Sequence, residues 1–583
     1  MLRGFRWQFL VLLSASVLFL VSLTLRSPGA APTGATPAPT DEPTPTELPA
    51  TPTLPAAALI EPAPAAQTVK TYREAVVGQF GRLNPLFANL NPVDRDITAL
   101  IFEGLVRTNA YGEPEPLLAE GWIVSSNRLE YVVHLRTDVL WQDGIPFTAA
   151  DVIYTFSLLQ SPDFPGDQAV GRFWQTVEVQ PLSSHVVRFR LTQPLAKFLD
   201  ALRIGILPEH ALRGTTADQI ASHPFNLTPI GTGPYQLEAL RPSADGRVHT
   251  VDLRAAPVYR LRPEGQSGHW LNRFSFRLYD TFSDALAALQ AGEIEGLQAR
   301  TPDERLALAN IPQIHLHTAL EPAVGVLIFN WQRDETRFFR EQRVRVALMT
   351  GLDRAAIVDR YLPNLAVRAD SPLFPGTWAY AEPLPWPIPD VNAARSLLEA
   401  TSVRLRDGDP TPEPGGIRLR FSILVLDDPA LEGLARDIAV QWSQMGIAVT
   451  IEAAPAQRYQ ERLDSGDFDA AIVELAMGDS ADPDVYAFWH EGQYPDGANY
   501  GGVNDRRISE SLERARSDPS GLNRIIHYRE FQRDFIERAI AIPLYYPLYT
   551  YATASSVTGV QLGFIGTPAS RFYSLRDWDI LAG

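Results

Sequence analysis

Three aspartates lie within six residues of one short segment, Met477–Phe488, which reads MGDSADPDVYAF. Carboxylates this close together can bind a metal ion, act as acid and base in catalysis, or neutralise a cationic group of a ligand. The spacing of Asp479, Asp482 and Asp484 lacks the D-x-[DN]-x-[DN]-G pattern of a calcium loop, and Pro483 fits such a loop poorly. The choice between these kinds of chemistry therefore depends on the rest of the chain.

Other signatures of catalysis or cofactor binding are missing from the sequence. There is no cysteine, which excludes disulfides, thiolate catalysis, cysteine-bound metals and a lipid-modified N-terminal cysteine. No G-x-S-x-G, P-loop, G-x-G-x-x-G or H-E-x-x-H spacing occurs. His315 and His317 share one side of an expected strand without a clear third ligand, so we expect exposed strand histidines there. We predict a protein that is not an enzyme and that uses no cofactor and no bound metal.

The length and charge of the chain restrict its class. A chain of 583 residues is too long for one core and suggests two to four structural units at about 150 residues each. A net charge of -17 argues against nucleic acid or an anionic lipid surface as the main partner, because phosphates require a basic face. Cationic and zwitterionic partners stay open.

The N-terminus carries a membrane segment. Arg3 and Arg6 precede an uncharged run of 19 residues, Trp7–Leu25, which is long enough to cross a hydrocarbon core of about 30 Å. The run exceeds the apolar core of about 7 to 15 residues that signal peptides have, and Arg26 follows it without a clean A-x-A site. We interpret residues 1–26 as an uncleaved anchor, with a cleaved signal peptide as the alternative, and the positive flank puts the remaining chain outside the cytoplasm.

Residues 27–67 form a second low-complexity segment. It contains eleven prolines, many alanines and threonines, and no basic residue. Such a segment cannot bury enough apolar surface to fold, so we expect a disordered, extended tether with a reach of up to about 130 Å. The expected location is the extracytoplasmic face of the cell membrane, to which the N-terminal segment anchors the protein.

The remaining chain alternates between strand and helix patterns. Leu129–Arg136 and Val187–Leu191 alternate apolar and polar residues as half-buried strands do. Thr148 begins a capping-box pattern before a helix over Asp151–Leu159. We therefore expect a small α+β unit over residues 110–205.

A βαβ pattern leads into the segment with the three aspartates. A helix over Leu431–Met445 is followed by a strand over Ile447–Glu452, a short helix over Tyr459–Leu463 and a strand over Phe468–Glu474. The segment Met477–Phe488 begins where this last strand ends. Ligands of open α/β sheets bind at the carboxyl ends of strands, so this position favours a ligand-binding loop.

Several segments, taken in order, resemble the family 5 solute-binding proteins of ABC importers, a class that includes dipeptide, oligopeptide and nickel-complex binders. Each segment is a weak signal alone, but their order and spacing are specific. The segments are Leu83–Phe87, Ile101–Val106, Glu115–Trp122, Leu140–Gly144, Phe147–Val152, Gly231–Tyr235, Leu289–Ile294, Phe329–Asn330, Arg343–Ala347, Leu352–Val358, Gly446–Ile447, Gly466–Asp469, Gly478–Asp484 and Ile542–Tyr546.

The resemblance implies an α/β, two-lobed periplasmic-binding-protein fold (type II, class C) with an extra α+β subdomain in lobe one. Lobe one would comprise residues 68–312 and 543–583, with 110–205 as the subdomain, and lobe two residues 313–542. The implied function is an extracytoplasmic receptor that captures a small peptide by hinge closure and delivers it to an ABC permease in the membrane. We expect a monomer without a nucleic-acid partner.

The resemblance also distinguishes the three aspartates. In peptide-binding members an aspartate at the position of Asp479 pairs with the α-ammonium of the peptide, whereas Asp482 and Asp484 would shape the turn. Relatives often carry tryptophan where this chain has Ala476. The same fold binding an oligosaccharide, an opine-like conjugate or a chelated metal is therefore the alternative, and an extracytoplasmic hydrolase using paired carboxylates is a third.

Five further residues are candidates for the ligand site. Asn330 and Trp331 follow an expected strand and could line the cleft through an amide and an indole, although an aromatic ring there could equally belong to the core. Trp378 and Tyr380 lie in a proline-rich loop of lobe two. Arg368 is a candidate for the basic residue that would meet a ligand carboxylate.

Overall fold

The computed structural model describes residues 69–195, 197–261, 271–401, 403–404, 417–478, 480–518 and 520–581. The predicted anchor and tether, residues 1–67, lie outside the described residues, and so does Asp479. No helix in the described ranges is both long enough and apolar enough to cross a membrane. Residues Thr68–Gly583 form one unit.

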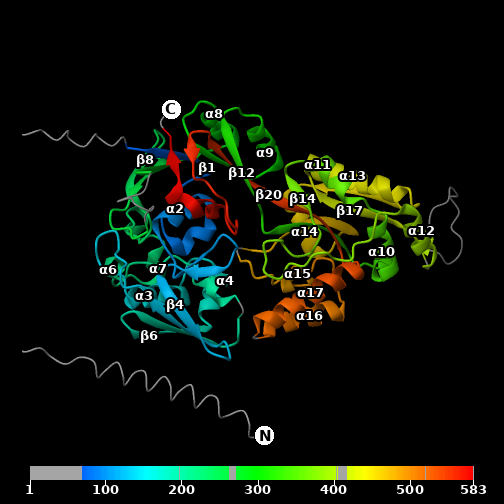
Figure 1. Ribbon diagram of the computed structural model, residues 1–583, viewed down its shortest axis with the longest axis horizontal. Helices are drawn as coiled ribbons and strands as arrows, with labels where there is room; N and C mark the ends of the chain where they lie inside the picture. Colours follow the sequence, from blue (N-terminus) through cyan, green and yellow to red (C-terminus); the bar gives the residue numbers. More distant parts are fainter. Residues whose placement is uncertain are drawn as a thin grey trace, which may run out of the picture. The chain divides into compact units, whose positions relative to one another are not determined.

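One large mixed sheet extends through both halves of this unit (Figure 1). Its strands lie in the order β18-β17-β19-β13-β20-β11-β1-β10-β9-β8. In lobe one, β1 is parallel to β10 and β11; in lobe two, β17 is parallel to β18 and β19. The elements of lobe one are β1 (Thr71–Val77), η1 (Pro85–Leu90), α2 (Pro92–Ile101), β2 (Val106–Thr108), β3 (Pro114–Pro116), η2 (Pro224–Leu227), β8 (Tyr235–Pro242), β9 (Val248–Ala255), β10 (Arg273–Tyr279), α8 (Phe282–Gln290), β11 (Gly296–Ala299), α9 (Pro302–Ala309), β12 (Ile314–Leu320), β21 (Val557–Thr558), η5 (Pro568–Asp577) and β22 (Asp579–Ile580).

Strand β20 (Ile542–Ala554) connects the two lobes. Its first half pairs with β13 (Ala323–Phe329) and β14 (Ala366–Arg368) of lobe two, and its second half pairs with β11 and β12 of lobe one. The second connection, Glu321–Pro322, joins β12 to β13 beside it. Strand pairing thus changes from one lobe to the other at Glu321–Pro322 and near Pro547. These positions lie close to the lobe limits predicted from the sequence, 312/313 and 542/543, and the limits themselves stay a prediction.

The segment from β4 to β7 folds as a separate antiparallel sheet with helices, as the strand and capping patterns predicted. Its sheet order is β4-β5-β7-β6. The Thr148 side chain caps α3, and Asp151 Oδ2 accepts a hydrogen bond from Thr148 N at 2.9 Å. The elements are β4 (Ala119–Val124), β5 (Glu130–Leu135), α3 (Ala149–Gln160), α4 (Gln168–Trp174), β6 (Val177–Ser183), β7 (Val186–Leu191), α5 (Phe198–Ala201), α6 (Glu209–Leu212) and α7 (Ala217–Ile220).

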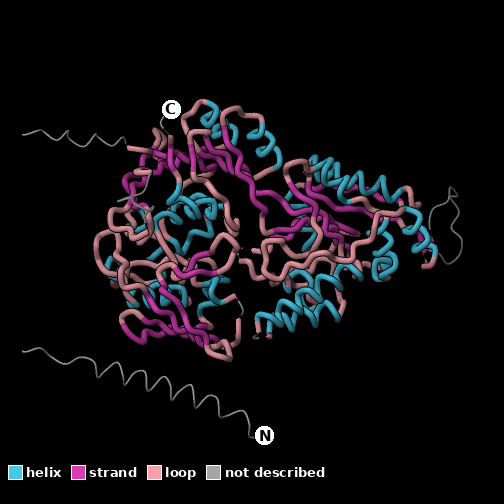
Figure 2. Tube along the Cα trace, viewed as in Figure 1, coloured by secondary structure: helices cyan, strands magenta, loops and turns pink. Residues whose placement is uncertain are grey.

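Lobe two contains the predicted βαβ units with ends shifted by a few residues. Helices cover its sheet, as Figure 2 shows. Gly466, with φ of 68°, ends α14 and lets the chain turn into β19. The elements are η3 (Arg337–Arg340), α10 (Gln342–Thr350), α11 (Arg354–Tyr361), α12 (Val391–Glu399), β15 (Val403–Arg404), β16 (Ile417–Arg418), β17 (Arg420–Leu426), α13 (Pro429–Ser443), β18 (Ala448–Ala454), α14 (Ala456–Ser465), β19 (Ala470–Ala476), α15 (Tyr486–Trp489), η4 (Glu491–Gln493), α16 (Arg506–Ser517) and α17 (Gly521–Glu537).

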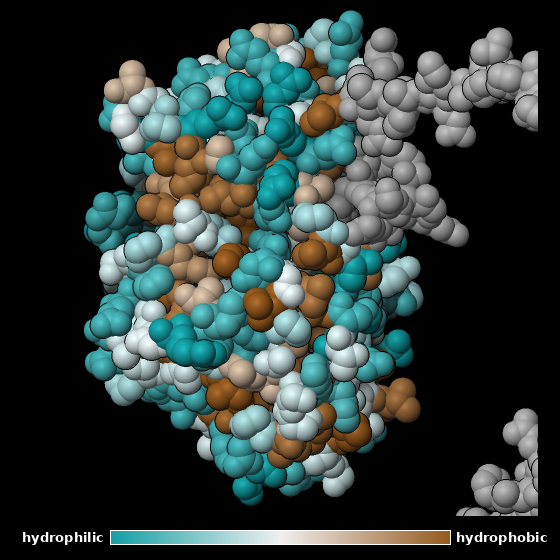
Figure 3. Space-filling model, turned by 90° about the vertical axis from the view of Figure 1, so that its left-hand side faces the viewer, coloured by the Kyte–Doolittle hydropathy of each residue, from teal (hydrophilic) through white to brown (hydrophobic). Residues whose placement is uncertain are grey.

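The two lobes have separate hydrophobic cores. The core of lobe two joins β13, β17 and β19 to α10, α13 and α17, whereas the core of lobe one continues into the antiparallel subdomain. A smaller cluster lies under α8 and α9. On the face of the body in Figure 3, hydrophilic residues border several groups of hydrophobic ones. Two cores joined through few strands are the arrangement that permits hinge motion.

Candidate functional site

The segment Met477–Phe488, called the aspartate loop below, starts at the carboxyl ends of three parallel strands. β17, β18 and β19 end at Leu426, Ala454 and Ala476, and their parallel pairing brings these ends to one edge of the sheet. Open α/β sheets bind ligands at this edge. The predicted position of the loop is therefore confirmed.

Two of the three aspartates hold the loop in place. The carboxylate oxygens of Asp482 accept hydrogen bonds from Arg524 Nη2 at 2.9 and 2.8 Å, which ties the loop to α17. Burial raises the pKa of Asp482, and the Arg524 charge opposes this shift. Asp484 Oδ2 accepts from Arg516 Nε of α16 at 2.9 Å. Both carboxylates are thus used within lobe two.

The aspartate loop also touches lobe one. Ser480 Oγ donates to Asp200 Oδ2 of the subdomain helix α5 at 2.5 Å. Ala481 N donates to the carbonyl oxygen of Gly112 at 3.1 Å. These contacts join lobe two to lobe one, so the lobes touch at the aspartate loop.

A cavity of about 430 Å³ opens in lobe one beside these contacts. Asp200 and Phe564 belong to its wall, and the Phe564 ring also makes an edge-on contact with Phe374 of lobe two, with ring centroids 5.9 Å apart. Its volume is in the range of about 300–1,000 Å³ that suits a small organic ligand. Charged and aromatic side chains in the wall include Arg95, Glu103, Arg107, Arg203, Tyr259 and Tyr573.

A row of three residues lies in the lobe-two sheet, just before β20 passes into lobe one. Gly325 of β13 pairs with Glu474 of β19 on one side and with Tyr545 of β20 on the other. Tyr545 Oη donates to Glu474 Oε2 at 3.4 Å. A Cβ on Gly325 would lie 2.3 Å from the Tyr545 ring, so only glycine lets this ring lie across β13.

Two carboxylates, Glu474 and Glu321, and one cation, Arg305, lie at or beside this row. The Glu474 side chain is solvent-exposed, yet the surrounding protein limits its hydration and raises its pKa, and the nearby Glu321 raises it further. Burial also raises the pKa of Glu321, although Arg305 Nη2 donates to Glu321 Oε1 at 3.2 Å. Sequence analysis missed Glu474. The detectable signal is one charged residue in the apolar strand AAIVELA, near its carboxyl end.

The structure places Asn330 and Trp331 inside lobe two. Asn330 Nδ2 donates to the carbonyl oxygens of Gly466 and Phe468, both at 3.0 Å. The buried Trp331 ring lies under the Arg345 guanidinium, 3.9 Å from its centroid. These contacts favour structural roles, and a ligand contact by either residue stays a prediction.

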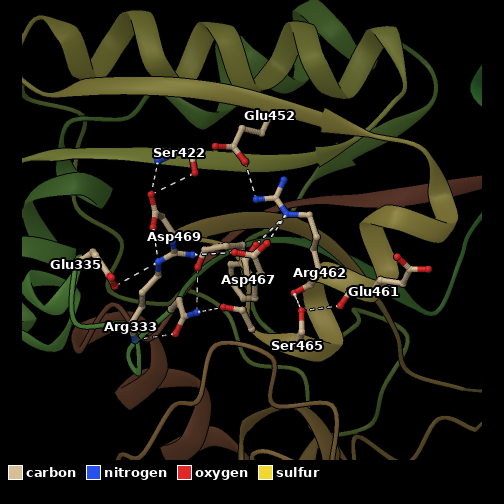
Figure 4. A network of polar contacts seen from close by, with 12 residues as sticks. Arg333, Glu335, Ser422, Glu452, Glu461, Arg462, Ser465, Asp467 and Asp469 are labelled. Atoms are coloured by element: carbon tan, nitrogen blue, oxygen red, sulfur yellow. Dashed lines mark hydrogen bonds and ion pairs between the residues drawn. The ribbon is translucent and has the colours of Figure 1, made fainter.

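The turn that Asn330 holds belongs to a network of ion pairs at the start of β19 (Figure 4). Arg333 lies 3.3 Å from both Asp467 and Asp469. Asp469 Oδ2 in turn accepts from Ser422 N of β17 at 2.9 Å. The network fixes β19 against β17 and so fixes the start of the aspartate loop at the other end of β19.

Trp378 and Tyr380 contact different parts of the protein. The half-buried Trp378 ring stacks with the Arg524 guanidinium at 4.9 Å and makes an edge-on contact with Tyr528. It therefore supports the cation that holds Asp482. Tyr380 Oη instead donates to Glu382 Oε1 at 2.7 Å. Ligand binding by either aromatic residue stays a prediction.

The other polar candidates have partners within the protein. Arg368 of β14 donates to both oxygens of Asp370, at 2.9 and 2.8 Å. His317 Nε2 lies 2.9 Å from Thr553 Oγ1. Within the described ranges, no group of three or more histidine, aspartate or glutamate side chains is placed to bind a metal ion.

Comparison with known proteins gives a consistent match. Residues 113–496 match the model of the family described as "Bacterial extracellular solute-binding proteins, family 5 Middle". The chain is 24% identical over 518 residues to the oligopeptide-binding protein AppA of Bacillus subtilis, covering 87% of this chain and 91% of AppA. It is 23% identical over 459 residues to the dipeptide-binding protein of Escherichia coli, covering 73% and 80% of the two chains.

The fold matches solved structures as well. The chain is similar to NikZ from Campylobacter jejuni, solved in complex with Ni(L-His), with a TM-score of 0.65 and 24% identity. The match covers 87% of this chain and 99% of that chain. The two-lobed α/β architecture predicted from the sequence is therefore confirmed.

Proposed function

Because the chain belongs to family 5 of the bacterial extracellular solute-binding proteins, we propose that it captures a small peptide between its lobes and delivers it to an ABC permease. One observation carries this proposal. The aspartate loop begins at the edge of lobe two where the parallel strands have their carboxyl ends, and it reaches Asp200 of lobe one through Ser480. The similarity to oligopeptide- and dipeptide-binding proteins supports a peptide ligand.

Hinge closure would occur about the two connections between the lobes. β20 and Glu321–Pro322 lie side by side there, and each lobe keeps its own core when the other moves. The sequence places the lobe limits at 312/313 and 542/543, and we propose that they lie a few residues later, at Glu321–Pro322 and near Pro547, where strand pairing changes. The closed form is what a permease would recognise, because only the ligand-bound receptor favours it.

Residues 1–26 are proposed to anchor the receptor and residues 27–67 to tether it. Holding a receptor near the bilayer raises its effective concentration at the permease. We propose that the protein acts as a monomer, without catalysis, cofactor or nucleic-acid partner. A cleaved signal peptide is the alternative, and mass spectrometry of the native protein would distinguish them by the mass of its N-terminus.

Asp479 is proposed to pair with the α-ammonium of the peptide. Asp479→Asn should weaken peptide binding by at least about 2 kcal/mol, close to 30-fold, because the buried ammonium would lose its counter-charge. Calorimetry with short peptides measures the change. Asp464→Asn, which alters an exposed aspartate of α14, is the control. Unchanged affinity in the Asp479 variant would remove this role.

A second ligand class has support of its own. The chain is similar in fold to NikZ, which was solved with Ni(L-His), and it has Ala476 where peptide-binding relatives often have tryptophan. The receptor could therefore bind a metal chelate or another non-peptide solute. Calorimetry with a peptide mixture, a sugar panel and a metal-chelate panel decides between these ligands. Heat from the sugar or chelate panel alone would reject the peptide.

A further inference from the structure

Glu474 is an exposed residue near the carboxyl end of β19. Its neighbours Val473 and Leu475 are buried, whereas Glu474 and Ala476 are exposed. Residues two apart share one face of a strand, so Glu474 and Ala476 line the same surface, just before the aspartate loop. A carboxylate at this place can contact whatever lies in the cleft.

An aromatic ring lies beside this carboxylate. Tyr545 crosses Gly325, where even a single Cβ would collide with the ring. Its hydroxyl is 3.4 Å from Glu474 Oε2, a long contact that leaves most of the carboxylate unbound. Tyr545 is only 4% exposed, so a ligand would meet the exposed Glu474 carboxylate and not the face of the ring.

The charge on Glu474 is not balanced within the protein. Arg305 is committed to Glu321 at 3.2 Å and to the Leu365 carbonyl oxygen at 3.1 Å. In the part of the chain that the structure describes, no arginine, lysine or histidine forms an ion pair with Glu474. Two neighbouring carboxylates and one arginine leave an excess of one negative charge.

Among the described residues, a buried hydroxyl on the strand face that carries Glu321 also has no hydrogen-bond partner. Tyr549 is 2% exposed, and its phenol oxygen accepts and donates no hydrogen bond among the described residues. Tyr549 pairs with Ala319, and Glu321 N donates to the Pro547 carbonyl oxygen. Glu321 and Tyr549 therefore project from the same face of the β12–β20 pair. Buried hydroxyls are normally hydrogen-bonded, so this unpaired oxygen is an unusual feature of the face that carries Glu321.

We propose that Glu474, with Glu321 and the Tyr545 hydroxyl next to it, forms a subsite for a cationic side chain of the ligand. The inference rests on the proposed peptide-binding function and adds to it a substrate class, peptides that carry lysine or arginine. An ammonium or guanidinium here would form an ion pair with Glu474. The net charge of -17 would also draw cationic ligands toward the protein.

The test compares arginine with citrulline, its uncharged analogue of nearly the same shape. The full-length chain, purified in detergent, is titrated by calorimetry with tripeptides of alanine that carry arginine or citrulline at each position in turn. At one position the arginine peptide should bind at least about tenfold tighter. Glu474→Gln should reduce that preference to about twofold or less and leave the citrulline peptides unchanged, since only the charge pair is lost. Glu461→Gln, at an exposed carboxylate of α14, should behave as wild type.

The outcomes separate this inference from the proposed function. Peptide binding without a preference for arginine at any position, or a preference that survives in Glu474→Gln, overturns the subsite while peptide binding stands. If no tripeptide binds, the proposed peptide-binding function fails. Spermidine, a small polycation, is then used as the probe for the cation subsite. Spermidine binding that Glu474→Gln abolishes supports the cation subsite, and no spermidine binding overturns it.

Discussion

At the scale of single residues, Glu474 and Glu321 place two carboxylates close together in surroundings that limit their hydration. The pKa values of Glu474 and Glu321 are both raised, because the surrounding protein limits their hydration and, at Glu474, because the two carboxylates repel each other. A ligand-binding site often carries such a cost, since the groups that bind a ligand are unsatisfied without it.

Neutralising Glu474 should stabilise the empty protein at neutral pH. A raised folded-state pKa means that the neutral carboxyl favours folding, a contribution present below the unfolded pKa of about 4.3 and lost as pH rises through the folded pKa. Glutamine keeps the side chain neutral. Glu474→Gln should therefore unfold at a higher temperature than wild type at pH 7 and at the same temperature at pH 3.5.

Thermal unfolding without ligand at the two pH values measures this effect. Glu461→Gln is the control, because Glu461 is exposed and pairs with Arg458 at the surface. A lower unfolding temperature of Glu474→Gln at pH 7 would contradict the unfavourable charge at this position.

At the scale of elements, α17 positions the aspartate loop. The Asp482–Arg524 pair is largely buried, with side chains 10% and 6% exposed, and Trp378 stacks on the arginine. Burying an ion pair is costly, but removing only one partner costs more, since the other charge then stays unpaired away from water. The pair therefore serves the geometry of the loop more than the stability of the fold.

A double-mutant cycle tests this pair. Arg524→Met alone should lower the free energy of unfolding by about 3–5 kcal/mol, because it leaves the Asp482 charge buried and unpaired. The double variant Arg524→Met/Asp482→Asn should lose less free energy of unfolding than the two single variants lose together, by about 1–3 kcal/mol. Urea unfolding at pH 7 gives the values.

The exposed pair Arg458–Glu461, with side chains 63% and 51% exposed, provides the control for this cycle. Arg458→Met should change the free energy of unfolding by at most about 0.5 kcal/mol. Additive losses at Asp482 and Arg524 would show that the two side chains do not interact.

At the scale of the whole molecule, contacts at the cleft mouth join two bodies that are otherwise linked at the hinge. The cores of the lobes are separate, and Ser480 of lobe two bonds to Asp200 of the subdomain. Such a contact forms only when the lobes are closed, so it stabilises the closed form and not the open form. It should therefore set how often the receptor closes without a ligand.

Ser480→Ala should shift the lobes toward the open form. Loss of one hydrogen bond of about 0.5–1.5 kcal/mol lowers the ratio of closed to open molecules by roughly two- to tenfold. The chain has no cysteine, so dyes can be attached at Leu182→Cys in β6 and Val440→Cys in α13, both exposed positions. Single-molecule energy transfer on the full-length chain in detergent reports the ratio.

The control for the closure experiment is Ser443→Ala in α13, where the hydroxyl bonds only to the Val440 carbonyl oxygen of its own helix. This variant should leave the ratio unchanged. Identical distributions for Ser480→Ala and wild type would show that the contact with Asp200 does not hold the lobes together.

The sequence by itself determined the local elements and the place of the aspartate loop. The capping box at Thr148 predicted the start of α3, apolar alternation predicted β5 and β7, and the βαβ pattern predicted β18 and β19. These features depend on neighbouring residues, whose periodicity and capping chemistry act within a few positions of the chain. The family motifs, spread through both lobes, added the two-lobed order.

Only the tertiary structure decided which distant residues share the site. Glu474, Gly325 and Tyr545 meet because β19 and β20 both pair with β13, and no local pattern indicates which strands become neighbours. Ser480 reaches Asp200 across 280 positions of sequence for the same reason. Strand pairing and lobe contact follow from how the whole chain buries its apolar surface, so the charge of the cleft became visible only in the folded molecule.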